Sequence, residues 1–199
     1  MVITMRIIAA TNNANKVREI CEIFVPLGFD VIPQSNAGIE IEVEETGDTF
    51  KKNALIKARA VAMLSDDYVI ADDSGLCVEA LGGRPGVMSA RYAGEGATDK
   101  EKINKLLGEL EGEENRRAKF CCCIAMIFPD GREYTAQGEV KGRILMEPRG
   151  ENGFGYDPVF FSDELSKTFA EATNEEKNSV SHRGRALAAM YETIKNESK

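Results

Sequence analysis

Apolar and polar positions in the first part of the chain change from strand-like to helix-like spacing and back. Met5–Ala10 is a short apolar run, which is typical of a buried strand. The next apolar positions fall at i, i+3, i+4 and i+7 of one helical face: Val17, Ile20, Cys21 and Phe24. This spacing predicts a helix that ends near Gly28, and Asp30–Pro33 then has the pattern of a second short strand.

The middle of the chain continues the alternation of helices and strands. A second helix is predicted over Thr49–Leu64, with apolar residues inside and the following basic residues largely outside: Lys51, Lys52, Lys57 and Arg59. Tyr68–Ala71 has the pattern of a buried strand, which ends at the polar residues Asp72-Asp73-Ser74-Gly75. Thr98 and Glu101 have the spacing of a capping box and predict the start of a third helix.

The second half of the chain contains the clearest hairpin signal. Arg117–Phe128 and Arg132–Val140 are strand-like and flank the turn residues Pro129-Asp130-Gly131. A last helix is predicted to begin near Ser181. Early strand–helix units followed by a long hairpin indicate an α/β fold with a mixed sheet rather than a purely parallel one.

Composition agrees with a soluble globular protein. The chain has 199 residues, 43% of them hydrophobic and 29% charged, which suits one domain, residues 1–199, formed of two lobes. The net charge of −8 argues against sequence-independent nucleic-acid binding. The longest uncharged apolar stretch, Phe120–Phe128, is too short to span a membrane. The N-terminus reads as a first strand without signal-peptide features, so we expect a cytoplasmic enzyme.

The cysteine and histidine content narrows the possible chemistry. The five cysteines, without a CxxC pair and in apolar surroundings, are expected to be reduced core thiols. His182 is the only histidine, which excludes sites that need two. A metal ion would therefore be held mainly by oxygen ligands, as Mg²⁺, Mn²⁺ or Ca²⁺ are.

Polar residues gather at four places where open α/β sheets bind ligands. The first is a strand-to-helix loop, Thr11, Asn12, Asn13, Ala14, Asn15 and Lys16. Amides at a helix start and a nearby lysine suit phosphate oxygens, although neither a P-loop nor a dinucleotide fingerprint is present. An ordinary helix cap at Asn13 or Asn15, with Lys16 in solvent, would give the same sequence.

The second and third places carry paired carboxylates. Glu44-Glu45 and Asp72-Asp73 each place two acids side by side, which is unfavourable unless cations offset the charge. One carboxylate from each pair, with phosphate oxygens and water, is a usual way to hold Mg²⁺. A solvated acidic edge at Glu44-Glu45 and an Asx turn at Asp72-Asp73 are the structural alternatives.

The fourth place is the glycine-rich stretch 150–157. Glycines on both sides of Phe154 allow close backbone approach, and its ring could stack on a base or lie in the core. Farther along, Lys177 and Ser181-His182-Arg183 supply hydrogen-bond donors before the last helix, although a lone histidine there is commonly structural.

Together these segments resemble the inosine triphosphate pyrophosphatase family, also described as non-canonical purine NTP or XTP/dITP diphosphatases. The resemblance runs nearly end to end, and its motifs are TNNANK (11–16), EETGDTFKKNALIKA (44–58), ADDSGL (71–76), GGRPGVMSARYAG (82–94), GFGYDPVFF (153–161) and EEKNSVSHRGRAL (175–187). It implies a long mixed sheet in two lobes around a nucleotide cleft, Mg²⁺-dependent hydrolysis of ITP, dITP and XTP to the monophosphate and pyrophosphate, and a homodimer.

The resemblance also implies a role for each site residue. Glu45 and Asp73 would bind the metal, and Asp73 would also activate the attacking water. The residues implied in substrate binding are Thr11, Asn12, Asn13, Ala14, Asn15 and Lys16 for the triphosphate, Ser74, and Phe154, Gly155, Tyr156, Asp157, Lys177, His182 and Arg183 for the base. Whether Asp72 shares the base role with Asp73 is open.

Three other functions fit parts of the sequence less well. A pyrophosphatase of modified pyrimidine nucleotides would share the metal chemistry. A nucleotide-binding sensor without turnover would not need a water-activating acid such as Asp73. A Ser- or Cys-nucleophile hydrolase using His182 would be expected to show a GxSxG elbow, which the sequence lacks.

Overall fold

The computed structural model describes residues 5–197, and regular elements follow one another along most of this range. The strands are β1 (Arg6–Ala9), β2 (Asp30–Pro33), β3 (Tyr68–Val78), β4 (Arg117–Ile127), β5 (Glu133–Ile144), β6 (Phe160–Ser162) and β7 (Lys167–Thr168). The α-helices are α1 (Ala14–Phe24), α2 (Phe50–Ala62), α3 (Asp99–Glu109), α4 (Asn174–Val180) and α5 (His182–Glu197). Short 3₁₀ turns cover Val25–Leu27, Gln34–Ala37, Glu79–Leu81 and Gly86–Arg91.

The strands form one seven-stranded sheet in the order β2-β1-β3-β4-β5-β6-β7. β1 runs parallel to both of its neighbours, with Ile7 opposite Val31 of β2 and Ile8 opposite Val69 of β3. β5, β6 and β7 are antiparallel, with Arg143 opposite Phe161. The predicted α/β class with a mixed sheet is therefore confirmed.

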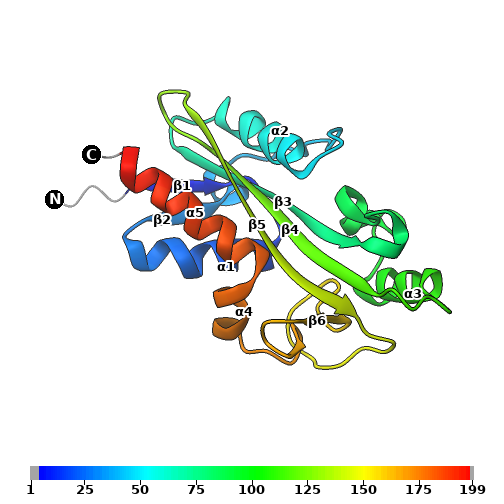
Figure 1. Cartoon of the computed structure of the whole chain (residues 1–199). Helices are drawn as coiled ribbons and strands as arrows, with labels where there is room; N and C mark the ends of the chain where they lie inside the picture. The colour runs from blue at the N-terminus through cyan, green and yellow to red at the C-terminus, as the bar shows by residue number, and fades with distance from the viewer. Residues whose placement is uncertain (1–4, 198–199) are drawn as a thin grey trace. The chain divides into compact units, whose positions relative to one another are not determined.

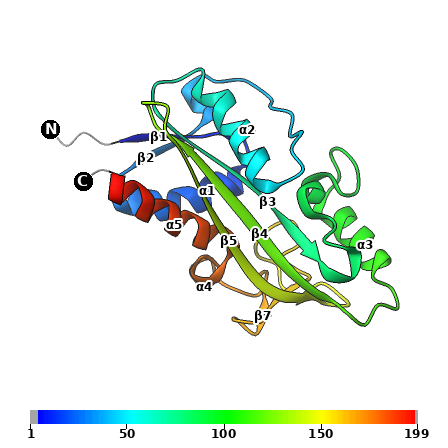
Figure 2. The same cartoon turned by 45° about the horizontal axis from the view of Figure 1, so that its top comes forward.

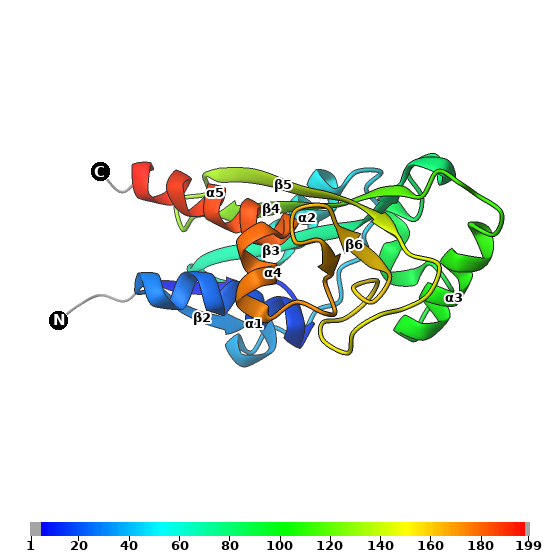
Figure 3. The same ribbon diagram turned by 60° about the horizontal axis from the view of Figure 1, so that its bottom comes forward.

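The chain packs as two compact units, of which the first contains the parallel strands. It combines the chain up to Asp73, the segment Cys122–Gly138 and the chain from Arg183 onward. Helices α1 and α5 bury Ile20, Phe24, Leu187 and Met190 against one face of its strands, and α2 buries Ala54, Ala58 and Val61 against the other (Figure 1). The start of β1 and the end of α5 lie at the same end of this unit (Figure 3).

The second unit comprises Ser74–Cys121 and Glu139–His182. Its core joins Leu76 and Val78 of β3 to Leu106 and Leu110 in and after α3, and α3 lies beside this part of β3 and β4 (Figure 2). Aromatic side chains fill the rest of this core, since Phe120 packs on Phe160 and Phe169 at ring distances of 4.6 and 5.9 Å.

Local sequence signals explain where three of the helices begin. The Asn13 side chain accepts hydrogen bonds from the backbone N–H groups of Asn15 and Lys16 and so caps α1. Thr49 caps α2 through the N–H of Lys52. Thr98 and Glu101 form the predicted capping box at the start of α3. Gly28, at φ +89°, ends the first helical region where the sequence predicted it.

The structure differs from the sequence predictions in four elements. β3 does not end at Ala71 but continues to Val78, so Asp72 and Asp73 lie inside a strand rather than in a turn after it. β6, β7 and the short helix α4 were not predicted, since three, two and seven residues are too short for a periodic signal. Residues 1–4 of the predicted N-terminal strand lie outside the described residues.

The described residues also show the state of the cysteines and the length of the apolar helices. In residues 5–197 all five cysteines are free thiols. Cys122 and Cys123 are buried and the half-buried Cys21 packs against the core of the first unit, whereas the core prediction was wrong for Cys77 and Cys121, which are half-buried. None of the helices in this range is long and apolar enough to cross a membrane.

Candidate active site

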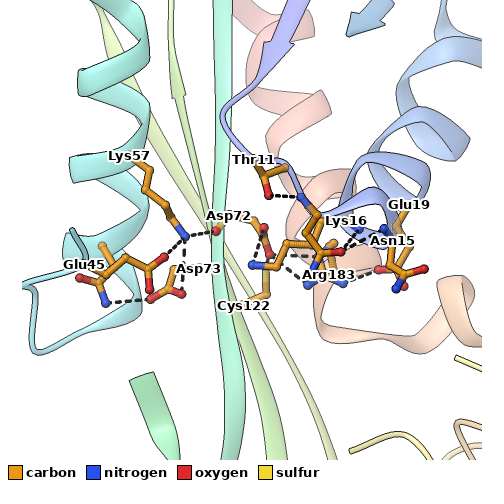
Figure 4. A network of polar contacts seen from close by, with 12 residues as sticks. Thr11, Asn15, Lys16, Glu19, Glu45, Lys57, Asp72, Asp73, Cys122 and Arg183 are labelled. Carbon is orange, nitrogen blue, oxygen red and sulfur yellow. Dashed lines mark hydrogen bonds and ion pairs between the residues drawn. The ribbon is translucent and has the colours of Figure 1, made fainter. Parts of the chain in front are cut away.

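Asp72 and Asp73 divide the polar residues of the first unit into two groups. Both lie in β3 and both are buried, at 1% and 4% exposure. Because side chains alternate along a strand, the two carboxylates point to opposite faces of the sheet, as Figure 4 shows. Asp73 faces Glu45 and Lys57, whereas Asp72 faces Lys16, Glu19 and Arg183.

On the Asp73 face, two carboxylates converge on one ammonium group. Lys57 Nζ lies 2.5 Å from Glu45 Oε1 and 3.7 Å from Asp73 Oδ1, and it also donates to the Asp72 carbonyl at 2.7 Å. All three side chains are nearly shielded from solvent, at 13%, 20% and 6% exposure for Lys57, Glu45 and Asp73. The arrangement can hold a cation between a loop carboxylate and a strand carboxylate.

A buried asparagine fixes the positions of these two acids. Asn53 is fully buried on α2, donates from Nδ2 to Asp73 Oδ2 at 3.0 Å and accepts from the Gly47 N–H at 2.7 Å. A Cβ on residue 47 would lie 2.6 Å from the Asn53 oxygen, so only glycine allows this approach. Asn53 thus ties the loop that carries Glu45 to the strand that carries Asp73.

The electrostatics of this face favour a basic carboxylate at Asp73. Burial raises the pKa of Asp73, the positive charge of Lys57 opposes that rise, and the negative charge of Glu45 adds to it. For Lys57, burial favours the neutral form, but the surrounding carboxylates outweigh it and raise its pKa. A carboxylate with a raised pKa is a better proton acceptor than a free aspartate.

The same face fits a hard divalent cation. Within residues 5–197 no group of three or more His, Cys, Asp and Glu side chains is arranged to hold a metal ion. Mg²⁺ needs no such group, because it is commonly bound by one or two carboxylates, with substrate phosphates and water as the other ligands. Glu45 and Asp73 already share one positive charge through Lys57, so their donor set suits that ion.

On the other face, Asp72 is the centre of a buried ionic network. Its carboxylate lies 3.0 Å from Lys16 Nζ and 3.0 Å from Arg183 Nη2, and Arg183 also pairs with Glu19 (Figure 4). Burial opposes ionisation of Asp72, but Lys16 and Arg183 outweigh it and hold its pKa well below the usual range. Asp72 is therefore ionised at neutral pH and holds two cations.

The loop before α1 has a helix cap at Asn13 and also a lysine that is held in place, so it has features of both a plain cap and a ligand-binding loop. Asn13 Oδ1 accepts from Asn15 N and Lys16 N at 3.0 and 3.3 Å, and Thr11 Oγ1 accepts from Asn13 N. The cap at Asn13 is therefore real, yet Lys16 is not in solvent, because Asp72 fixes its ammonium group. Asn12, Asn13 and Ala14 are exposed, so a ligand could approach this loop.

In the second unit, Asp157 organises the glycine-rich loop. Its Oδ2 accepts from the Phe154 N–H at 2.9 Å and from Lys177 Nζ at 2.7 Å. Gly153, at φ +78°, would place a Cβ 2.2 Å from this carboxylate, so the loop requires glycine here. Lys177 Nζ lies 4.6 Å from the centre of the half-buried Phe154 ring, in a cation–π contact on one face.

Other contacts fix the remaining predicted residues of this unit. Gly155 N–H donates to Asp99 Oδ2 at 2.7 Å, and the buried Tyr156 hydroxyl donates to the Ser89 carbonyl at 3.0 Å. The His182 ring stacks on Phe120 at 4.8 Å, with an angle of 11° between the rings. Ser74 follows Asp73 in β3 and is half-buried.

The structure thus brings some of the predicted site residues into contact with one another, and it adds site residues that the sequence did not predict. Glu45 joins Asp73, and Phe154 joins Asp157 and Lys177, but Arg183 lies in the Asp72 network. Sequence reasoning missed Asn53, Lys57, Glu19 and Asp99, and its placement of Lys57 largely outside was wrong, because that side chain bridges buried acids. The i, i+4 spacing of Asn53 and Lys57 beside inward-facing alanines was the available signal.

Known proteins resemble this chain over nearly its whole length. The model of the Ham1 family matches residues 7–193. A dITP/XTP pyrophosphatase of Bacillus subtilis is 49% identical over 196 residues, covering 98% of this chain and 99% of the relative, and one of Treponema denticola is 47% identical over 194 residues, covering 96% and 99%. The solved structure of a Ham1 protein from Staphylococcus aureus has a TM-score of 0.87 at 43% identity, covering 96% of this chain and 99% of that one.

Proposed function

The chain belongs to the Ham1 family, and from this premise we propose that it hydrolyses non-canonical purine nucleoside triphosphates, dITP, XTP and ITP, to the monophosphate and pyrophosphate. Removal of these nucleotides keeps them out of DNA and RNA. The observation that carries the proposal is the meeting of Glu45 and Asp73 at Lys57, because it supplies a cation site, a basic carboxylate and a positive charge in one place.

The first unit is proposed to perform the reaction. Glu45 and Asp73 would hold Mg²⁺, which neutralises phosphate charge and makes bound water more acidic. Asp73 accepts the proton of the water that attacks the α-phosphate, for which its raised pKa suits it. Lys57 and Lys16, with the exposed amides of the loop before α1, neutralise and orient the triphosphate and the departing pyrophosphate.

Asp72 is proposed to act on the reaction only through the residues it holds. Its depressed pKa and its position on the opposite face from Asp73 make it a poor proton acceptor. Its ion pair with Lys16 instead fixes the ammonium group that faces the phosphates. We therefore assign the base role to Asp73 alone.

The second unit is proposed to recognise the base. Phe154, whose ring already contacts the Lys177 ammonium group, would stack on the purine. Lys177 and His182 are donors suited to the C6 oxygen of hypoxanthine and xanthine, whereas adenine presents an amine there and would leave a donor unpaired. A base-reading role for Arg183 stays a prediction, since its guanidinium group is engaged by Asp72 and Glu19.

Release of pyrophosphate from ITP, XTP, dITP, GTP, ATP and dTTP, with and without Mg²⁺, tests the proposed function. We expect Mg²⁺-dependent release of pyrophosphate, not single phosphate, from ITP, XTP and dITP far above ATP. Equal rates on all six would contradict the account of base recognition. No release from any of them would contradict the activity and favour a modified pyrimidine substrate or a nucleotide sensor. We also expect a cytoplasmic homodimer, and light scattering of the purified protein tests the dimer.

Lys177→Met is expected to reduce the preference for ITP over ATP by about 10-fold or more, because a hydrogen bond from a charged donor is lost to one substrate only. The ratio of kcat/KM values for the two nucleotides measures this effect, and it does not depend on the fraction of folded enzyme. Lys167→Met is the matched control, because Lys167 also pairs with a carboxylate, Glu176 at 2.8 Å, but both of those side chains are only partly buried. An unchanged ratio in Lys177→Met would place base recognition elsewhere.

A further inference from the structure

Two cysteines of the second unit lie against each other on neighbouring strands. Cys77 belongs to β3 and Cys121 to β4, two neighbouring strands of the sheet, and each thiol shifts the pKa of the other. Both are half-buried, whereas Cys122 and Cys123, the next residues along β4, are buried. The pair is therefore open to small reagents, and its two thiols lie on adjacent strands. None of the roles proposed above uses it.

Cys77 also faces a cavity with a positively charged lining. The cavity has a volume of about 290 Å³, and its lining includes the thiol-bearing residue Cys77, the acid Glu79 and three basic residues, Arg117, Lys119 and Lys141. Lys119 pairs with Glu139 at 2.8 Å, and both side chains remain nearly half exposed. Such a lining favours a thiolate over a neutral thiol and admits a small polar molecule.

The two thiols differ in acidity. Interaction with the Cys121 thiol lowers the pKa of Cys77 to about 7; burial opposes this, Lys119 supports it and Glu139 opposes it. The same interaction, followed by burial, raises the pKa of Cys121. Near neutral pH Cys77 is thus partly thiolate while Cys121 stays a thiol, and this difference is the one expected between an attacking and a resolving cysteine.

We propose that Cys77 is a site of reversible oxidation by small hydroperoxides, with Cys121 as the resolving cysteine that closes a disulfide between β3 and β4. In the first step the Cys77 sulfur attacks one peroxide oxygen, a sulfur–oxygen bond forms and the oxygen–oxygen bond breaks. The leaving oxygen takes a proton and departs as water or an alcohol, and Cys77 becomes a sulfenic acid.

In the second step the Cys121 sulfur attacks the Cys77 sulfur. A sulfur–sulfur bond forms, the sulfur–oxygen bond breaks, and the hydroxyl group leaves as water with the Cys121 proton. The two thiols together lose two electrons, which the peroxide gains. A dithiol reductant restores both thiols by thiol–disulfide exchange. Because the two cysteines lie on neighbouring strands, we expect closure by side-chain rotation with little movement of the strands.

Peptide mapping of the full-length protein tests the proposal. The reduced protein is treated with a small excess of hydrogen peroxide, blocked with an alkylating reagent and digested. We expect a mass lower by two hydrogen atoms and one linked peptide pair that joins Cys77 to Cys121, both reversed by dithiothreitol. Oxidation that begins at Cys21, Cys122 or Cys123, or a lasting absence of the linked pair, would overturn the proposal.

Single variants separate the two roles. In Cys121→Ser, a sulfenic acid at Cys77 should accumulate and be trapped by dimedone, whereas Cys77→Ser should resist the same dose of peroxide. Cys21→Ser is the matched control, because Cys21 is also half-buried but burial and nearby acids raise its pKa, and it should leave the linked pair unchanged. Equal peroxide sensitivity of Cys77→Ser and the parent protein would contradict the assignment.

Native alkylation gives a measurement that needs no variant. With iodoacetamide at pH 7, Cys77 should react at least about 10-fold faster than Cys121 or Cys21, since about half of it is thiolate at a pKa near 7. Comparable rates at the three sites would contradict the proposal even if every variant failed to fold.

Discussion

Asp73→Asn is expected to lower kcat for ITP hydrolysis by about 10³-fold while nucleotide binding is largely retained, because general-base catalysis contributes about 10² to 10⁴-fold. The asparagine keeps the size of the side chain but cannot accept the proton of the attacking water. Steady-state pyrophosphate release gives kcat and KM, and equilibrium binding of ITP shows whether the site still takes substrate.

The proposed double role of Asp73 requires a comparison with Glu45. Glu45→Gln removes one proposed metal ligand but leaves the base, so raising the Mg²⁺ concentration should restore much of its activity. The same titration should restore little in Asp73→Asn. Equal recovery in both variants would limit Asp73 to metal binding, and full activity in Asp73→Asn would remove it from the mechanism.

Asp48→Asn is the matched control for these two substitutions. Asp48 lies in the same loop as Glu45, is exposed, and pairs with Lys52 at 2.8 Å rather than with any proposed site residue. Its substitution removes one negative charge from the same region without removing a ligand or a base. We expect activity equal to that of the parent protein, so a loss here would show that net charge alone explains the other two results.

The parts of the fold that could be predicted from sequence are those set by local interactions. The cap at Asn13, the capping box at Thr98 and the hairpin turn at residues 129–131 depend on neighbours within a few positions, and the structure contains all three. The family was also predictable, because six motifs occur in order along the chain, and the Ham1 family match confirms it.

The course of β3 could not be predicted, because it depends on the rest of the sheet. Two adjacent aspartates after an apolar run are typical of a turn, since acids disfavour the interior of a buried strand. Here each carboxylate has its own cations, Lys57 for Asp73 and Lys16 with Arg183 for Asp72, so the strand can continue through both. Those cations come from three different helices.

The position of Arg183 could not be predicted either, because it also depends on contacts between residues far apart in sequence. Its partner Glu19 is 164 residues away in sequence, and neither residue has a local signal that distinguishes it from a surface charge. The pairing of Glu45 with Asp73 was easier to anticipate, because the sequence predicted that one acid from each adjacent pair would meet at a cation, and both acids contact the Lys57 ammonium group. The lysine between them was missed because Lys57 falls in a run of basic residues that reads as a solvated face.

Arg183→Met is expected to lower the free energy of unfolding by about 3–5 kcal/mol, because loss of one partner leaves a buried charge uncompensated. Arg183 is 1% exposed and contacts two buried acids, so methionine would fill the space but leave Glu19 and Asp72 facing each other. Urea unfolding of the two proteins at neutral pH measures the difference, and it does not depend on any catalytic role of Arg183.

Arg59→Met is the matched control for the buried arginine. Arg59 also binds a carboxylate through two nitrogens, with both contacts to Glu133 at 2.7 Å, but its side chain is 55% exposed. An exposed ion pair contributes about 0–1 kcal/mol, so its loss should change stability little. Similar losses in the two variants would mean that the Asp72 network is not the source of the effect.

The pH dependence of the free energy of unfolding gives an independent check of the role of Arg183, because the direction of the change can be predicted. The folded-state pKa of Asp72 lies well below its ordinary value of 3.8, so its ionic contacts stabilise the protein above that value and are lost as the pH falls below it. Without Arg183 this pKa should lie closer to 3.8, and acidification should remove less stability from the variant. The difference between the parent protein and Arg183→Met should therefore be largest near neutral pH and shrink toward pH 3. A constant difference would assign the stabilisation to packing of the arginine side chain rather than to its charge.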